Sequence, residues 1–510
     1  MPRPDGGKTM GGARIVFVPV DERFCTRDYF LLLAEGAGLE VVTPALAELG
    51  QKKTSPDLAR LRRGVLSSVR DGDTVIASVD MLVHGGLIPS RVSLESLDTL
   101  EERLSIFPAM KQKAARVYAS QCVTRAPFYN SSDEEPDYWA FFGTRLWALS
   151  KEIARFRRHQ IGHEALSRAA RGIPDWIVKD FLSRRMRNFR LVSRTLDLVA
   201  EGEIDFLNLT LDDNTEGSIS LWESEQHARK VKSLGIEEKV SIHPGADEST
   251  LTLLARCLCG AAGRKPRIRV EYSAPSMRHF VPPFEGSPHE QSIRSHLEAA
   301  GCGVTEGEGE DALLFVHNPT DSLDARRQKA SHAPRGLYER ALRRIESYPG
   351  IVGIAGTRYV NGSDNRFVSG LLARPLDWSR LAYAGWNTAG NTLGTTIAFM
   401  VARLLHAKKL IPGSPEKLAR LQTVFFLEHW AYMSLVRGRL LRKARRRGCR
   451  GWNIMPAEPW ATGYVEQELS RYLPAIRTAT GFACGGLRVS FPWHRAFEVR
   501  IEPKEADGPR

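Results

Sequence analysis

The chain has 510 residues, which is enough for two to four domains of roughly 100–200 residues each. Its composition is that of an ordinary globular protein, and no apolar run of about 18 residues is present, which excludes a membrane-spanning helix. The N-terminal sequence MPRPDGGKTMGG lacks the apolar stretch of a signal peptide. We therefore expect a cytoplasmic protein without a membrane partner, in which residues 1–13 are disordered.

The chain has a formal net charge of +13. Much of the excess positive charge lies in residues 437–450, which read RGRLLRKARRRGCR at the end of an expected helix. No nucleic-acid-binding motif accompanies this run, so it favours a solvated helix face over a nucleic-acid site. The seven cysteines are scattered and odd in number, and the Cys-x-Cys at Cys257 and Cys259 has neither zinc nor redox spacing. They favour free thiols in a reducing compartment.

The first part of the chain alternates apolar, β-branched runs with segments of helical length. The expected strands are residues 13–20, 40–44, 74–81 and 116–124. Strands separated by helical connections form parallel sheets with right-handed crossovers, so we expect a parallel sheet here. Between about residues 136 and 201 the pattern changes to long, arginine-rich amphipathic helices, which we interpret as a helical insertion that caps the site.

The strand pattern resumes after the insertion. The further expected strands are residues 205–214, 239–248, 267–273, 312–318, 351–360 and 381–387. Ten strands are too many for a simple eight-stranded barrel, so we expect an α/β protein with more than one parallel layer. We divide the chain into an α/β domain at 14–262, a second α/β domain at 263–400 and a mostly helical region at 401–510, with a strand pair near 486–501.

The stretch DFLNLTLDDN at residues 205–214 is a strand that runs into two adjacent carboxylates, Asp212 and Asp213. The run KVSIHPGADE at residues 239–248 has the same layout and ends in Asp247 and Glu248. The carboxyl ends of parallel strands line the ligand crevice of α/β sheets, so these acidic residues are candidates for catalysis.

Polar residues of this kind follow five of the expected strands. The candidates are Asp21, Glu22 and Arg23; Asp80, His84 and Arg91; Asp212, Asp213 and Asn214; Asp247 and Glu248; and Asn361 and Asp364. Aspartate and asparagine are also favoured at helix N-caps, which occupy the same places, so each residue alone fits a cap as well as a site. The number of coincidences favours a shared site.

The loop YAGWNTAGNTLGTT at residues 383–396 lies between an expected strand and an apolar helix. Its backbone N–H groups at a helix N-terminus suit an anionic or polyhydroxylated ligand, although the lysine of a phosphate-binding P-loop is absent. Alternatively, Trp386 is a platform for a sugar ring, with Asn387, Thr388 and Asn391 reading hydroxyl groups. A core tryptophan beside ordinary capping residues remains the third interpretation.

Several of these segments resemble the bacterial domain-of-unknown-function family 4127. The resemblance is carried by VPVDERFCTRDYF, SVDMLVHGGLIPSR, TLDDN with HPGADE, YVNGSDN, and YAGWNTAGNTLGT, and it extends from about residue 14 to residue 400. The GWNTAGNTLGT segment is the most specific of them. The resemblance implies a shared fold and a shared pocket, and it supplies no reaction.

Three functions are compatible with these residues. The first is a hydrolase of carbohydrates or related polyhydroxylated small molecules, in which Asp212 or Asp213 works with Glu248 as an acid and base pair. The second is a hydrolase that depends on a divalent cation, held by the same carboxylates with Asp80, His84 or His243. The third is a sugar- or metabolite-binding protein without catalysis. We favour the first over the third because five sets of acidic strand ends exceed what binding needs, and over the second because the sequence has no HExxH zinc motif.

Overall fold

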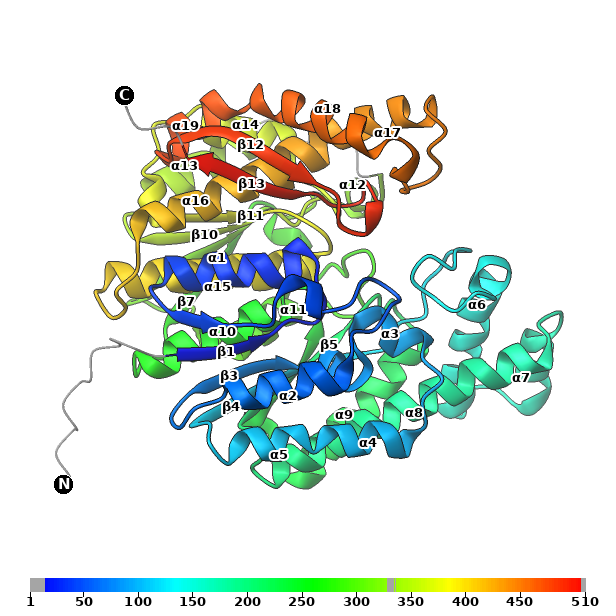
Figure 1. Cartoon of the computed structure of the whole chain (residues 1–510). Coiled ribbons are helices and arrows are strands. Elements are labelled where there is room, and N and C mark those ends of the chain that lie inside the picture. Colours follow the sequence, from blue (N-terminus) through cyan, green and yellow to red (C-terminus); the bar gives the residue numbers. More distant parts are fainter. Residues whose placement is uncertain (1–13, 328–333, 335, 506–510) are drawn as a thin grey trace, which may run out of the picture.

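The computed structural model describes residues 14–327, 334 and 336–505, and it contains two parallel β-sheets covered by helices and one antiparallel strand pair (Figure 1). This arrangement confirms the predicted α/β class with more than one parallel sheet and a helical C-terminal part. The segment 1–13, predicted to be disordered, lies outside the described residues. Within the described ranges, every helix is too short or too polar to cross a membrane.

The first sheet has six parallel strands in the order β2-β1-β3-β4-β5-β6. They are β1 (Arg14–Val18), β2 (Glu40–Val42), β3 (Thr74–Ser78), β4 (Arg116–Val123), β5 (Phe206–Leu211) and β6 (Val240–Pro244). The direction in which successive strands are added reverses between β1 and β3, as in doubly wound sheets. In such sheets, ligands bind at this reversal, just beyond the carboxyl ends of the strands. The ends of β1 and β3 are therefore the first places to look for a site.

Helices cover both faces of this sheet. They are α1 (Tyr29–Gly36), α2 (Leu58–Ser68), α3 (Leu87–Val92), α4 (Leu97–Leu104), α5 (Ile106–Lys111), α9 (Ile219–Leu234) and α10 (Ser249–Ala261). Short π-helical turns, η1 (Phe24–Asp28) and η3 (Asp80–His84), follow the ends of β1 and β3. Helices α2, α4 and α5 pack on one face in an apolar cluster of their own, whereas α1 and α10 join a larger core.

The second sheet has five parallel strands in the order β11-β10-β9-β7-β8. They are β7 (Arg267–Tyr272), β8 (Gly303–Val304), β9 (Ala312–Val316), β10 (Ile351–Ala355) and β11 (Leu381–Ala384). Its helices are α11 (His289–Ala299), α12 (Ser322–Arg327), α13 (Leu337–Ser347), α14 (Asn365–Leu372) and α15 (Ala389–Ala407). All ten predicted strands are present, and the sequence did not indicate β8, which has two residues.

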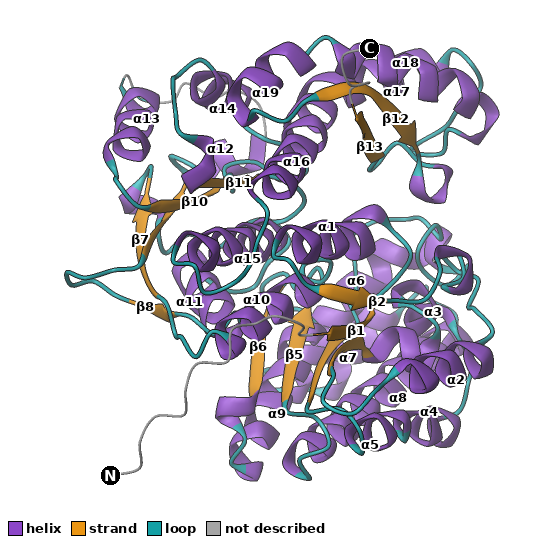
Figure 2. Cartoon of the chain, turned by 60° about the vertical axis from the view of Figure 1, so that its left-hand side comes forward, coloured by secondary structure: helices purple, strands orange, loops and turns teal. Residues whose placement is uncertain are grey.

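A layer of helices lies between the two sheets. Figure 2 shows α1, α10, α11 and α15 in this layer, and one apolar cluster runs from β1 through these helices to the second sheet and the C-terminal part. Most of α15 is buried because it packs on α10 and α11 on one side and on β10 and β11 on the other. This shared core fixes the ends of both sheets relative to each other.

The predicted helical insertion consists of α6 (Trp139–Arg157), α7 (His163–Ala170) and α8 (Asp175–Ala200). Helices α6 and α8 pack through a small apolar cluster that includes Trp139, Leu146 and Phe181. The insertion extends from the first sheet beside the carboxyl ends of its strands (Figure 1). The chain passes from the first sheet to the second in the turn between α10 and β7.

The C-terminal part consists of helices followed by a strand pair. Its elements are α16 (Pro415–Phe425), the π-helix η7 (Phe426–Val436), α17 (Arg437–Arg445), α18 (Glu458–Ser470), α19 (Leu473–Thr480), β12 (Cys484–Ser490) and β13 (Arg500–Glu505). Strands β12 and β13 are antiparallel. The loop that joins them, residues 491–499, returns to the carboxyl ends of the parallel strands. All seven cysteines are buried and unpaired by disulfides.

Candidate active site

A cavity of about 450 Å³ lies at the carboxyl ends of strands from both sheets. The first sheet contributes Arg23, Arg91, Arg125, Asp212, Asp213 and Asp247 to its lining. The second sheet contributes Phe284, Glu285, Asn361, Asn387, Thr388 and Asn391, and the C-terminal part contributes Trp452, Trp493, Arg495 and Phe497. The volume falls within the range of small-molecule sites.

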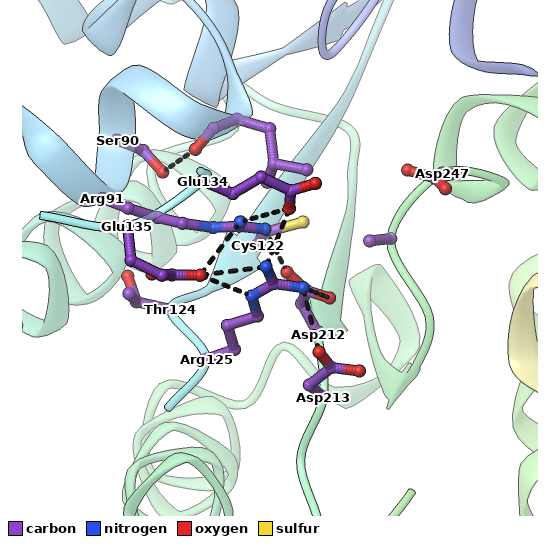
Figure 3. Close-up of polar contacts among 12 residues, drawn as sticks. Ser90, Arg91, Cys122, Thr124, Arg125, Glu134, Glu135, Asp212, Asp213 and Asp247 are labelled. Atoms are coloured by element: carbon purple, nitrogen blue, oxygen red, sulfur yellow. Dashed lines mark hydrogen bonds and ion pairs between the residues drawn. The ribbon is translucent and has the colours of Figure 1, made fainter. Parts of the chain in front are cut away.

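One wall of the cavity is a cluster of arginines and carboxylates (Figure 3). Arg91, on α3 after β3, donates a hydrogen bond to Oδ2 of Asp212, which follows β5. Arg125, directly after β4, binds Oδ2 of Asp213 at 2.9 Å and Oε2 of Glu134 at 2.8 Å. The two arginine side chains are almost completely buried, so the carboxylates hold them in fixed positions.

The carboxyl group of Asp213 is poised near neutral pH. Burial raises its pKa to about 6, against the opposing effect of Arg125 and with the charge of Asp212 adding to the rise. Asp213 has a positive φ of 38°, a left-handed conformation that aspartate tolerates at a turn. A carboxyl group with such a pKa is able to deliver a proton at neutral pH.

Asp247 belongs to a separate wall, and Figure 3 shows it apart from the Arg91 and Arg125 cluster. Arg23 binds its Oδ1 at 2.6 Å and also binds Oδ2 of Asp21 at 2.7 Å. Asn387 donates from Nδ2 to Asp247 Oδ2 at 2.9 Å, and Asn391 Oδ1 accepts from the Asp247 backbone N–H at 3.0 Å. Amides of the GWNT loop thus hold the turn that carries Asp247.

The C-terminal loop closes the cavity with aromatic rings and an arginine. The guanidinium groups of Arg23 and Arg495 lie 4.8 Å and 4.3 Å from the ring centre of Trp493. The Nε1 group of Trp493 donates to Oε1 of Glu22, which anchors the loop to the end of β1. The same arginine, Arg495, also pairs with Glu134 of the first wall.

The structure brings many of the predicted site residues together. Those that line the cavity are Arg23, Arg91, Asp212, Asp213, Asp247, Asn361, Asn387, Thr388 and Asn391. Those that lie outside its lining are Asp21, Glu22, Asp80, His84, Asn214, Glu248, Asp364 and Trp386.

Glu248 is fully buried between α10 and α15, where its Oε2 accepts from the Ala246 backbone N–H at 3.0 Å. The neighbouring Asp247 therefore faces the cavity in the place expected for Glu248. Trp386 is 4% exposed and stacks on His429 with ring centres 6.2 Å apart, which agrees with the core interpretation and not with a sugar platform. The cavity's tryptophans are Trp452 and Trp493 instead.

Several of the predicted residues support neighbouring groups. Asp21 accepts from Arg23 and Thr26, and Glu22 accepts from the Lys52 backbone N–H. Asp364 is the N-cap of α14 and also binds Arg358 at 3.0 Å. The role of Asp364 matches the helix-cap alternative considered for the strand ends.

Asp80 accepts from the Cys122 backbone N–H at 2.9 Å, and burial raises its pKa to about 7. His84 lies in the turn η3, and burial lowers its pKa to about 3. Asn214 is bonded through its backbone N–H to the Phe284 carbonyl oxygen. Among the described residues, Asp80 and His84 do not join a group that could hold a metal ion, whereas His243 and Glu248, which were also expected as ligands, lie together with His296.

Sequence reasoning missed part of the lining. Arg125 ends an expected strand, so the rule applied to the carboxylates would have selected it as well. Glu134 comes from the acidic loop SSDEEPD that precedes the insertion, and Arg495 comes from the distant segment PWHRAF. Only the three-dimensional structure brings these two segments to the strand ends.

The fold and the cavity define an α/β protein with two parallel sheets whose strand ends share one charged, aromatic-lined site. The chain belongs to the family described as protein of unknown function (DUF4127), whose model matches residues 15–502. No curated protein and no solved structure matches the chain. The family description names no reaction, so the activity has to be argued from the cavity.

Proposed function

We propose that the protein is a hydrolase that acts on a carbohydrate or a related polyhydroxylated small molecule by carboxylate acid and base catalysis. The observation that carries this proposal is the placement of carboxyl groups on two walls of one cavity, with Asp212 and Asp213 on one wall and Asp247 on another. Two carboxyl groups that flank a glycosidic bond are the usual machinery for its hydrolysis.

Asp213 is the general acid in this proposal. Its pKa of about 6 keeps part of the population protonated near neutral pH, so that Asp213 can protonate the oxygen of the leaving group. Asp247, whose pKa burial also raises to about 6, acts in its ionised form on the facing side of the scissile bond, where it activates a water molecule or attacks the sugar carbon itself. Asp212, paired with Arg91, maintains the negative charge beside Asp213.

The rest of the lining supports a polyhydroxylated ligand. The ring of Trp452, which is 42% exposed, offers a flat apolar face against which the C–H face of a sugar packs. Side-chain amides of Asn361, Asn387 and Asn391 supply donors and acceptors for hydroxyl groups. The cavity volume of about 450 Å³ suits a ligand of one or two sugar rings.

The proposal is tested by screening purified protein against aryl glycosides and natural oligosaccharides. With a hydrolysed substrate in hand, Asp213→Asn and Asp247→Asn should each lower kcat by about 10²- to 10⁴-fold, the usual effect of removing a general acid or base. Asp377→Asn is the matched control, because Asp377 is an exposed N-cap of a short helix and asparagine keeps the cap.

Unchanged kcat in Asp213→Asn and Asp247→Asn, with normal melting temperatures, would remove the catalytic assignment. Saturable sugar binding without turnover by the wild-type protein would replace the hydrolase with the binding function.

A further inference from the structure

Three buried side chains meet behind the turn that carries Asp247. His243 comes from β6, Glu248 from the residue before α10, and His296 from α11. Each is at most 1% exposed, and one ligand atom of each lies within 4.8 Å of the ligand atoms of the other two. His296 Nε2 lies 3.5 Å and His243 Nδ1 lies 4.0 Å from Glu248 Oε1, and both separations are longer than an ordinary hydrogen bond.

The hydrogen bonds of the two histidines define which nitrogen carries a lone pair. His243 Nδ1 lies 2.9 Å from the Pro244 carbonyl oxygen, and His296 Nδ1 lies 2.7 Å from the Ser292 carbonyl oxygen. A carbonyl oxygen only accepts, so each Nδ1 carries a hydrogen and each Nε2 of the neutral ring has its lone pair free.

Both Nε2 atoms and Glu248 Oε1 are buried, and none of the three has a hydrogen-bond partner among the described residues. The other oxygen of Glu248 is held by the Ala246 backbone N–H. Burying a polar atom without a hydrogen-bond partner is unfavourable, and three acceptors close together also repel one another. A cation between them would satisfy all three.

We propose that His243, Glu248 and His296 bind one divalent transition-metal ion, with Zn²⁺ as the preferred occupant. Two imidazole nitrogens and one carboxylate are a common zinc ligand set, and a backbone carbonyl that accepts from the second ring nitrogen is the usual support for a metal-binding histidine. Tetrahedral zinc places ligand atoms about 3.4 Å apart, so ligand atoms that lie within 4.8 Å of one another need to approach by at most about 1.4 Å around the ion.

The ion would join β6, α10 and α11 directly behind the cavity. Glu248 follows Asp247, and both belong to the turn that begins at Gly245. Helix α15 packs on Glu248 from the other side. The contact is so close at Gly394 that a side chain at this position would have no room. The metal therefore stabilises the turn that presents Asp247, and it takes no part in the proposed hydrolysis.

Metal content is the direct test, and it requires no substrate. The full-length wild-type protein, stripped with chelator and then titrated with Zn²⁺ against a chromophoric competitor, should bind one equivalent per chain. His243→Ala and His296→Ala should weaken this binding by at least about 100-fold. His227→Ala is the matched control, because His227 is equally buried but stacks on Phe189 in another part of the fold.

A second measurement keeps the test decisive if the variants do not fold. Replacement of zinc by Co²⁺ in the wild-type protein should give the visible absorption bands of a four- or five-coordinate nitrogen and oxygen site, and added Zn²⁺ should raise the melting temperature of the stripped protein. The competing explanation is a protonated Glu248 that donates to His296 Nε2 without any metal.

That explanation predicts less than about 0.1 equivalent of bound zinc, no cobalt bands and no thermal shift, and this result would overturn the proposal. The metal readout is independent of turnover, so this site and the proposed hydrolase activity stand or fall separately.

Discussion

Replacement of Gly394 by alanine tests whether the glycines of the GWNTAGNTLGT segment serve helix packing. Gly394 lies in α15 where this helix crosses the beginning of α10. A Cβ atom at this position would lie 2.9 Å from Thr252 Oγ1 and 3.1 Å from Glu248 Cβ, and it would lie even closer to Glu248 Cγ. Cβ atoms essentially never come within 3.0 Å of another heavy atom, so the two helices must move apart.

The expected magnitude follows from two opposing effects. Overpacking of a buried contact costs about 1–3 kcal/mol. We expect a cost of about 3 kcal/mol here, because the crowded atoms are Cβ and Cγ of Glu248, which a change of side-chain rotamer moves little. Alanine gains about 1 kcal/mol over glycine in helix propensity. We therefore expect a net loss of about 2 kcal/mol in the free energy of unfolding.

Urea unfolding monitored by circular dichroism measures this loss. Gly463→Ala is the control, because Gly463 is exposed in the middle of α18 and a Cβ there meets no atom within 4 Å. This variant should gain up to about 1 kcal/mol. If Gly394→Ala is as stable as Gly463→Ala, the close packing of α15 on Glu248 is wrong.

Three further changes have defined outcomes. Burial raises the pKa of Asp80 from 3.8 to about 7, so the folded state favours the protonated carboxyl group. The contribution of this group to the free energy of unfolding is complete below about pH 4 and is lost as pH rises through about 7. Urea midpoints measured at pH 5 and pH 8 should therefore differ less in Asp80→Asn than in the wild type. Arg125→Ala leaves buried carboxylates without their cation, so it should lower the free energy of unfolding by about 3–5 kcal/mol in a denaturant titration. Trp386→Ala should destabilise the fold by a similar amount, as core tryptophan deletions do, whereas Trp452→Ala, at a cavity residue that is 42% exposed, should weaken ligand binding with a smaller thermal shift; a larger binding defect in Trp386→Ala would return that residue to the site.

The strand ends were the predictable part of the site. Arg23 and Asp247 are 224 residues apart in the sequence, yet with Asp212 they line one cavity because the carboxyl ends of parallel strands lie at one edge of a sheet. The alternation of apolar strands and polar ends was enough to select them. The same pattern predicted an α/β fold with more than one sheet, because ten strands with helical connections are more than a simple eight-stranded barrel holds.

The choice between neighbouring side chains was not predictable. Asp247 and Glu248 are adjacent, but one faces the cavity and the other faces His296, because α15 packs against the start of α10. A single sequence does not show which face of that turn a distant helix covers. For the same reason, the ring of Trp386 lies in the core on His429, a residue of the C-terminal π-helix.

The cavity residues from the C-terminal part were the hardest to predict from the sequence. Trp493 and Arg495 reach the cavity on the loop between β12 and β13, more than 100 residues after the last parallel strand. Their positions depend on long-range packing of the hairpin, for which no local periodicity exists. An isolated cluster of aromatic and basic residues in PWHRAF was the available hint.

The pH dependence of kcat/KM on a hydrolysed substrate tests the central claim most directly, because this parameter reports the ionisation of the free enzyme. If Asp213 is the general acid, activity of the wild type should fall as pH rises above about 6, where this carboxyl group loses its proton. Asp213→Asn should lose most of the activity together with this alkaline limb. A wild-type profile that stays flat between pH 5 and 8, or an unchanged alkaline limb in Asp213→Asn, would contradict the assignment.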